Sequence, residues 1–198
     1  MRTIKELSIT GFKLLPSAKP VLFHGSTVRK TVTDHLWRKK LRPVILEQQG
    51  TKCSICKWIP ASNEEIRHLH LHEVEKYDFI NKVCHLIDIQ LICRKCHSFQ
   101  HIIRTQLVST EEQWKDLIAH FISVNGCSSD IINIFDLIIA KALQLESFNE
   151  TGLALLSLKE RKELERQPVR FTIDPHIPFA DELRKQIEKK GLLYNIEH

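Results

Sequence analysis

Two short stretches decide the fold that this sequence can adopt: CSIC at residues 53–56 and LICRKCH at residues 91–97. Each contains a C-x-x-C knuckle, and 36 residues lie between the two knuckles. Two such pairs present four thiolates that can close a tetrahedral site, the geometry of Zn²⁺ in structural centres. A redox motif needs only one C-x-x-C, so zinc is favoured over a redox pair or unrelated thiols. The predicted ligands of a structural Zn²⁺ are Cys53, Cys56, Cys93 and Cys96.

The composition is that of an ordinary globular protein. The chain has 198 residues, of which 42% are hydrophobic and 27% charged, and Gly and Pro are scarce. It has no run of eighteen apolar residues, and charged residues stand near its start where a signal peptide would be apolar. We therefore expect a cytoplasmic, intracellular protein that makes no contact with a membrane. Cys84 and Cys127 stand apart from the knuckles and are expected to be small buried residues.

Positive charge is concentrated in the first third of the chain. Residues 1–57 carry 12 Lys and Arg against 3 Asp and Glu, whereas the whole chain has a net charge of only +5. A basic surface of this kind gains affinity for nucleic acid by neutralising phosphates and releasing counterions. A solvated basic surface without a partner explains the charge equally well.

Between the knuckles, the stretch HLHLHEV at residues 68–74 alternates histidine with leucine. A period of two predicts a half-buried strand, with the leucines on one face and three imidazoles on the other: His68, His70 and His72. The simpler interpretation is that these are only polar residues on the solvent side of a strand.

A helix is predicted to start at the second knuckle. His97, His101 and Arg104 are related by i, i+4 and i+7, so they fall on one helix face. Two histidines four residues apart are a common way for a helix to hold a metal ion.

Short patterns predict the other elements. The first thirty residues suggest strand or loop pieces, and a helix is expected over residues 31–41. Ser109 and Glu112 match a capping box that starts a helix ending at Asn125-Gly126. Residues 129–146 are apolar all round, which predicts a buried helix or the interface of a homodimer. Further predicted elements are a helix at 43–49, a charged helix at 154–166, a strand at 169–173 and a helix at about 179–190.

Together, the knuckles, the His-bearing strand and the CxxCHxxxH run at residues 93–101 resemble the zinc-knuckled branch of the HNH endonucleases, in particular a subgroup of bacterial and phage HNH-like proteins. The resemblance covers roughly residues 37–104. It implies an α+β fold with a treble-clef, or ββα-metal, zinc core. The expected organisation is an N-terminal basic segment over 1–36, this core over 37–104 and a helical C-terminal extension over 105–198.

The resemblance also implies a catalytic site. His72 matches the metal-binding position on the strand, and His97 and His101 match two helix histidines that colicin-type nucleases use. They would hold a catalytic divalent cation such as Mg²⁺, Mn²⁺, Ni²⁺ or Zn²⁺. The expected partner is nucleic acid, namely double-stranded DNA, whose phosphates would be contacted by Lys39, Lys40, Arg94, Lys95 and Arg104.

Two positions depart from the family pattern. Glu73 stands where the family places a histidine as general base, and His70, on the same strand face as His72, is the rival base. A glutamate is roughly two pKa units less basic than a histidine, so it should abstract a proton from water more slowly. Asp88 stands where the family has an asparagine; it can accept a backbone hydrogen bond but cannot donate one as an amide does.

Two functions therefore remain open at the sequence level. One is a metal-dependent endonuclease, and the other is a zinc-stabilised nucleic-acid-binding or adaptor module that kept the fold and lost the chemistry. A third interpretation makes residues 105–198 the functional part, with the helix at 129–146 as a surface for a partner or for self-association.

Overall fold

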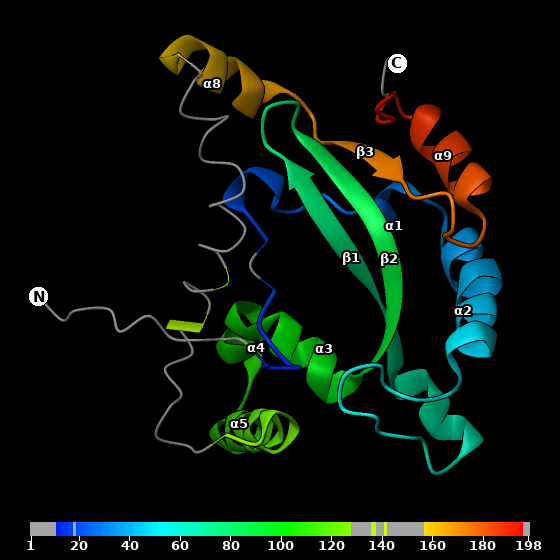
Figure 1. The fold of residues 1–198 in the computed structure, drawn as a ribbon, viewed down its shortest axis with the longest axis vertical. Coiled ribbons are helices and arrows are strands. Elements are labelled where there is room, and N and C mark those ends of the chain that lie inside the picture. The colour runs from blue at the N-terminus through cyan, green and yellow to red at the C-terminus, as the bar shows by residue number, and fades with distance from the viewer. Residues whose placement is uncertain (1–10, 18, 128–135, 138–140, 142–156, 196–198) are drawn as a thin grey trace, which may run out of the picture. The chain divides into compact units, whose positions relative to one another are not determined.

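A β-hairpin followed directly by a helix carries the segment that the sequence pattern singled out. In the computed structural model, strand β1 (Leu69–Asp78) and strand β2 (Val83–Cys93) are neighbours in one sheet, and β2 leads into helix α3 (Arg94–Gln100) (Figure 1). At the hairpin turn, the carboxylate of Asp78 accepts hydrogen bonds from the backbone and side-chain nitrogens of Asn81. The predicted strand is confirmed from Leu69 onward and extends four residues beyond Val74, whereas His68 is the last residue of a 3₁₀ helix and not part of the strand.

The structure describes residues 11–17, 19–127, 136–137, 141 and 157–195. These form two compact units. The first is built mainly from residues 11–17, 52–70 and 92–127, and the second from residues 20–51, 71–91 and 157–195. The domain boundaries expected from the sequence stay a prediction.

In the first unit, helices that follow the second knuckle pack around aromatic side chains. Phe99 of α3 and Phe121 of α5 are both fully buried, and their rings stack with centroids 4.5 Å apart. Phe12 meets Phe121 edge to face at 5.8 Å. Besides α3, the helices that can be described in this unit are η3 (Asn63–His68, a 3₁₀ helix), α4 (Ile102–Val108) and α5 (Glu111–Asn125). This aromatic core fixes α5 against α3.

Helix α5 is closed at both ends by its own residues. Its N-terminus has a capping box, but the pair is Thr110 with Gln113 rather than the predicted Ser109 with Glu112. Ser109 instead takes part in the end of the preceding helix, because its amide donates to the carbonyl of Thr105. The predicted C-terminus is confirmed, since Gly126 adopts the left-handed conformation at φ 64° that glycine accepts without strain.

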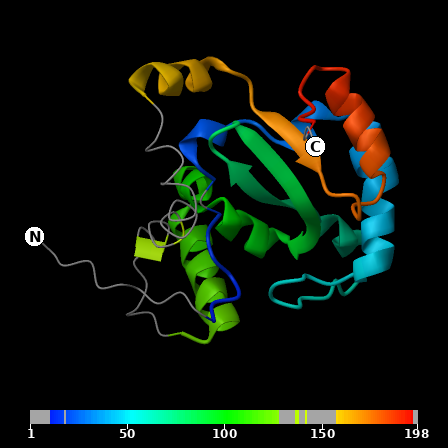
Figure 2. The ribbon, with the colours of Figure 1, turned by 45° about the horizontal axis from the view of Figure 1, so that its top comes forward.

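In the second unit, β3 (Arg170–Ile173) extends the hairpin to three strands in the order β1-β2-β3. It runs parallel to β2, with Val83 opposite Arg170 and Leu86 opposite Ile173. Helix α9 (Ala180–Glu188) lies beside β3 and α1 (Figure 2). Within its described residues, this unit also contains η1 (Val21–Phe23, 3₁₀), α1 (Val28–Thr31), η2 (His35–Leu41, a π-helix), α2 (Arg42–Gln49) and α8 (Leu158–Arg166).

The mixture of helices and one small sheet confirms the predicted α+β class. The helix expected at 43–49 is confirmed as α2, with Pro43 in its first turn and Gly50 after its end. Residues 19–30, where strand or loop pieces were expected, instead contain the short helical elements η1 and α1. The predicted helix over 129–146 lies outside the described residues, apart from three positions. Among the helices that the structure describes, none has the length and hydropathy needed to cross a membrane.

Candidate metal centre

The first knuckle is a tight turn that reverses the chain. The amide of Cys53 donates to the carbonyl of Trp58 at 2.8 Å, and the amide of Lys57 donates to the carbonyl of Cys53 at 3.0 Å. Lys57 has a φ of 65°, a left-handed conformation that is uncommon for a residue with a side chain. Its Nζ donates to the carbonyl of Ser54 at 2.7 Å, which holds the lysine across the turn. The turn therefore keeps Cys53 and Cys56 as neighbouring sulfur donors.

The second knuckle joins a strand to a helix. Cys93 is the last residue of β2 and the N-cap of α3, with extended backbone at φ −72° and ψ 163°. Its sulfur accepts a hydrogen bond from the amide of Cys96 at 3.5 Å. The first turn of α3 thus places the two sulfurs on the same side of the chain.

The structure brings the four predicted cysteines of both knuckles together within the first unit. Their sulfur atoms all lie within 4.8 Å of one another, and Cys56 Sγ is 3.6 Å from Cys93 Sγ. A tetrahedral zinc with bonds of about 2.3 Å would hold pairs of sulfurs about 3.8 Å apart. Three of the cysteines are buried and Cys56 is half-buried. The cluster has the donors and the spacing to bind a zinc ion.

The thiols are strongly coupled to one another. Hydrogen bonds from Cys93 and Cys96 lower the pKa of Cys53. Sharing of these hydrogen bonds raises the pKa of Cys93 to about 12 and raises the pKa of Cys96 as well. Without a metal, shared protons in hydrogen bonds between the sulfurs offset the repulsion that four thiolates would have. A divalent cation supplies the opposite charge and replaces those protons, as metal binding to thiols generally does.

A fifth side chain, which was not among the predicted site residues, contacts this cluster. His120 of α5 has its Nε2 3.3 Å from Cys96 Sγ, and the imidazole is half-buried. Burial lowers the pKa of His120, and the nearby Lys95 ammonium lowers it further. The available signal was weak, since His120 follows the buried Leu117 by three residues in α5 but is 24 residues from Cys96.

Three predicted histidines gather beside α3, also within the first unit. The ring of His70 stacks on that of His97, with centroids 4.9 Å apart and planes 13° apart. The ring of His101 meets His97 edge to face at 4.7 Å, and a ring nitrogen of each lies within 4.8 Å of the other. The expected single helix is wrong, because α3 ends at Gln100 and His101 has φ −102° and ψ 40°. The two rings still share a face, since the amide of His101 donates to the carbonyl of His97 at 3.2 Å.

The predicted residues His72, Glu73 and Asp88 belong to the second unit. His72 follows His70 by two residues on β1, so alternation places it on the same face of that strand. Glu73 accepts a hydrogen bond from the backbone amide of Arg29 at 3.0 Å. Asp88 accepts one from the amide of the next residue, Ile89, at 2.7 Å. Both carboxylates therefore have structural contacts within this unit.

Two of the five predicted phosphate-contacting residues form ion pairs with carboxylates. Lys95 Nζ lies 2.7 Å from Asp116 in the first unit, and Lys40 Nζ lies 2.7 Å from Glu182 in the second. The other three side chains are exposed: Lys39, Arg94 and Arg104.

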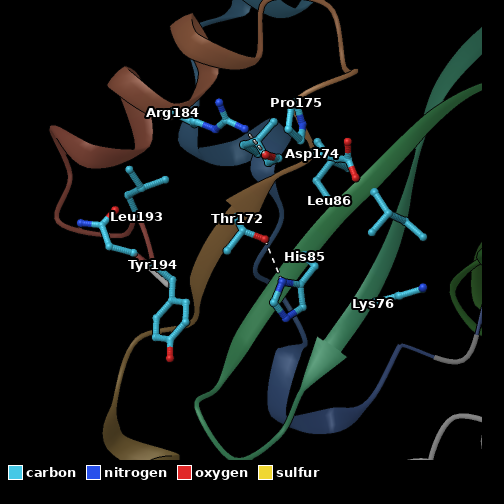
Figure 3. A pocket seen from close by; sticks show the side chains of 12 residues that line it. Lys76, His85, Leu86, Thr172, Asp174, Pro175, Arg184, Leu193 and Tyr194 are labelled. Carbon is cyan, nitrogen blue, oxygen red and sulfur yellow. Dashed lines mark hydrogen bonds between the residues drawn. The ribbon is translucent and has the colours of Figure 1, made fainter. Parts of the chain in front are cut away.

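The second unit has a surface depression of about 630 Å³ on the sheet beside α9 (Figure 3). Its polar groups are largely engaged by the protein: His85 Nδ1 lies 2.8 Å from Thr172 Oγ1, and Arg184 donates to the carbonyl of Ile173 at 2.6 Å. Burial lowers the pKa of His85, so its imidazole stays neutral in the folded chain near neutral pH. Among the described residues that line the depression, no group of His, Cys, Asp or Glu converges as the cysteines do.

A scan of the sequence against protein-family models, a search of curated proteins and a search of solved structures each returned no match.

Proposed function

We propose that this chain is a metal-dependent endonuclease of the HNH type, which hydrolyses DNA phosphodiester bonds and carries a structural zinc. The proposal extends the observed hairpin and helix to the treble-clef, ββα-metal core of that family. The observation that carries it is the pairing of His97, which directly follows the second knuckle, with His101 about one turn later; the two rings meet at 4.7 Å. In this arrangement, a cysteine cluster lies at the start of the helix that carries His97, and a backbone hydrogen bond joins His101 to His97 just after the end of that helix.

The proposed ligands of the catalytic ion are His97 and His101, together with His72 from β1. Neutral imidazoles suit first-row divalent metals, and three of them leave coordination positions open. An ion bound there, Mg²⁺, Mn²⁺, Ni²⁺ or Zn²⁺, would stabilise negative charge that develops on a phosphate oxygen and on the leaving 3′ oxygen.

His70 is the better candidate for the general base. One carboxylate oxygen of Glu73 already accepts a hydrogen bond from the amide of Arg29, which ties that side chain to the second unit. The imidazole of His70 stacks on that of His97, so it stays within reach of water held near the proposed ligands. A histidine also has a pKa nearer to neutral pH, which favours proton abstraction from water.

The direct test is nicking of supercoiled plasmid by the purified, zinc-loaded protein in Mg²⁺, Mn²⁺ or Ni²⁺. We expect cleavage that H97A and H101A abolish, while their circular dichroism and zinc content remain those of the unchanged protein. H24A is a matched control, because His24 is an exposed histidine in the second unit and outside the proposed site. Cleavage that persists in both H97A and H101A would refute the proposed ligands.

A second pair of variants separates the two candidate bases. If His70 accepts the proton, H70A should lose activity by roughly 10²–10⁴-fold at saturating metal, the usual contribution of a general base. E73Q keeps an oxygen that can accept from Arg29, so it should retain folding and most of the activity. A larger loss in E73Q than in H70A would reverse the assignment.

The alternative is a nucleic-acid-binding or adaptor module without catalysis. It is favoured by the structural contacts of Glu73 and Asp88, the two positions that depart from the family pattern. A folded protein that contains zinc and binds duplex DNA, yet cleaves it in none of the metals, would establish this module and exclude the nuclease.

A further inference from the structure

His120 is the one described side chain outside the knuckles that the structure shows bonded to a cysteine of the cluster. Its Nε2 lies 3.3 Å from Cys96 Sγ, a hydrogen-bonding distance for a sulfur acceptor. His120 is absent from the group of ligand atoms that lie within 4.8 Å of one another, which consists of the four sulfurs alone. The imidazole therefore stands next to the candidate zinc site without being a fifth ligand.

The chemistry of a zinc thiolate fixes the direction of this hydrogen bond. Once Cys96 binds zinc it has no proton, so its sulfur can only accept, and Nε2 of His120 must carry the hydrogen. Four thiolates and one Zn²⁺ leave a net charge of −2 in a largely buried place. A donor aimed at one sulfur disperses part of that charge, which is how groups behind the ligands commonly tune a metal site.

The packing of α5 on α3 gives this contact a defined position. Asp116, one turn before His120, pairs with Lys95 at 2.7 Å, and Lys95 directly precedes Cys96. Phe121, the residue after His120, stacks on Phe99 of α3 at 4.5 Å. The ion pair and the aromatic stack hold α5 against α3 on either side of His120. They place its imidazole near the sulfur independently of the hydrogen bond between the two.

We propose that His120 is a positioning residue of the zinc centre, which donates an N–H···S hydrogen bond to the Cys96 thiolate and strengthens the binding of the metal. The inference rests on the zinc site proposed above. It assigns to α5, a helix outside the segment that resembles the HNH family, a part in holding the metal.

The test compares two polar substitutions of similar character. In H120Q the side-chain amide nitrogen can reach the place of Nε2, whereas in H120N the shorter amide stops near the place of Nδ1. Each protein is loaded with Co²⁺, whose thiolate-to-metal charge-transfer band reports the electron density on sulfur. Zinc affinity is then measured by competition with a chromophoric chelator.

We expect H120N to bind zinc roughly 10- to 100-fold more weakly, the usual effect of losing a group behind a ligand. Its charge-transfer band should move to lower energy, because a sulfur without the hydrogen bond gives up charge more easily. H120Q should restore both properties. E111A is the matched control, since it breaks an exposed ion pair with Lys115 on the same helix without touching a sulfur, and its band should match that of the unchanged protein.

Two results would overturn the inference. If H120N and H120Q have the same band and the same affinity, the imidazole only packs against Cys96. If E111A moves the band as far as H120N does, the effect comes from a general change in α5 rather than from the hydrogen bond. Failure of the unchanged protein to bind Co²⁺ or Zn²⁺ is a distinguishable outcome, because it refutes the zinc site itself and the role of His120 with it.

Discussion

The free energy of unfolding of this chain should increase with the concentration of free zinc, and the size of the increase can be calculated for a single site formed by the four cysteines. The four sulfurs form one site, and its donors come from two segments far apart in the sequence, residues 53–56 and 93–96. An unfolded chain does not hold these segments together, so zinc binds the folded state preferentially. For one such site, the free energy of unfolding rises by about 1.4 kcal/mol for each tenfold increase in free zinc above the dissociation constant.

The expected size of the effect follows for a chain of this length. At 1,000 times the dissociation constant the stabilisation is about 4.1 kcal/mol. For proteins of 150–250 residues, 1 kcal/mol shifts the melting temperature by roughly 2–4 °C. Each tenfold step in free zinc should therefore raise the melting temperature by about 3–6 °C.

The assay is thermal unfolding followed by circular dichroism in metal buffers that set free zinc over several orders of magnitude. C53S should remove the dependence at low free zinc, while C127S should keep it, because Cys127 lies outside the cluster. If the histidines bind a second ion, a further increment appears at higher free zinc and is lost in H101A. A melting temperature that stays constant across the whole zinc range would refute the zinc site.

Three shorter predictions concern stability and DNA binding. Lys82 is buried and its Nζ donates at 2.7–3.0 Å to three carbonyls at the end of α8, so K82M should lower the free energy of unfolding by about 2 kcal/mol in denaturant titrations. Burial lowers the pKa of His85 in the folded state, so as the pH falls the unfolded chain takes up a proton at His85 before the folded chain does. The free energy of unfolding should therefore fall as the pH drops below about 6.5, and it should fall less steeply in H85Q. In duplex binding measured by fluorescence anisotropy, R94A should reduce the slope of log K against log salt by about 0.9, and K95A by less because Lys95 is paired with Asp116. The first argument would be contradicted if K82M were as stable as the unchanged protein, and the second if stability fell more steeply with pH in H85Q. The third would be contradicted if K95A changed the salt slope more than R94A does.

The parts of the fold that sequence predicted are those governed by local spacing. The C-x-x-C pairs predicted the sulfur cluster because a knuckle and a helix N-terminus each set the distance between their own two cysteines. The alternation at residues 68–74 predicted β1 because a strand shows every second side chain on one face. His97 and His101 lie on the same side, as predicted, although α3 ends between them, because the i to i+4 backbone hydrogen bond that joins them is still present.

What the sequence did not predict depends on contacts between distant segments. The hydrogen bond of Glu73 joins it to an amide 44 positions away, and nothing near Glu73 indicates that partner. His120 lies on a helix whose pattern indicates only a buried face, so its contact with Cys96 follows from how α5 packs on α3. The strand at residues 170–173 was predictable, but its parallel register against β2 was not.

The excess of basic residues in the first third of the chain has to be considered together with the ion pairs that these residues form. Carboxylates occupy several of its cations within the second unit: Glu182 pairs with Lys40 and Asp34 with Arg38, at 2.7 and 2.9 Å. These are exposed pairs, which contribute only about 0–1 kcal/mol to stability, so a phosphate can displace the carboxylate at little cost. Each displacement nevertheless releases fewer counterions than an unpaired lysine would, which weakens the salt-dependent part of DNA affinity. A basic composition is therefore a poor guide to how strongly this chain would hold DNA, and the case for a nuclease depends on the paired imidazoles of His97 and His101 instead.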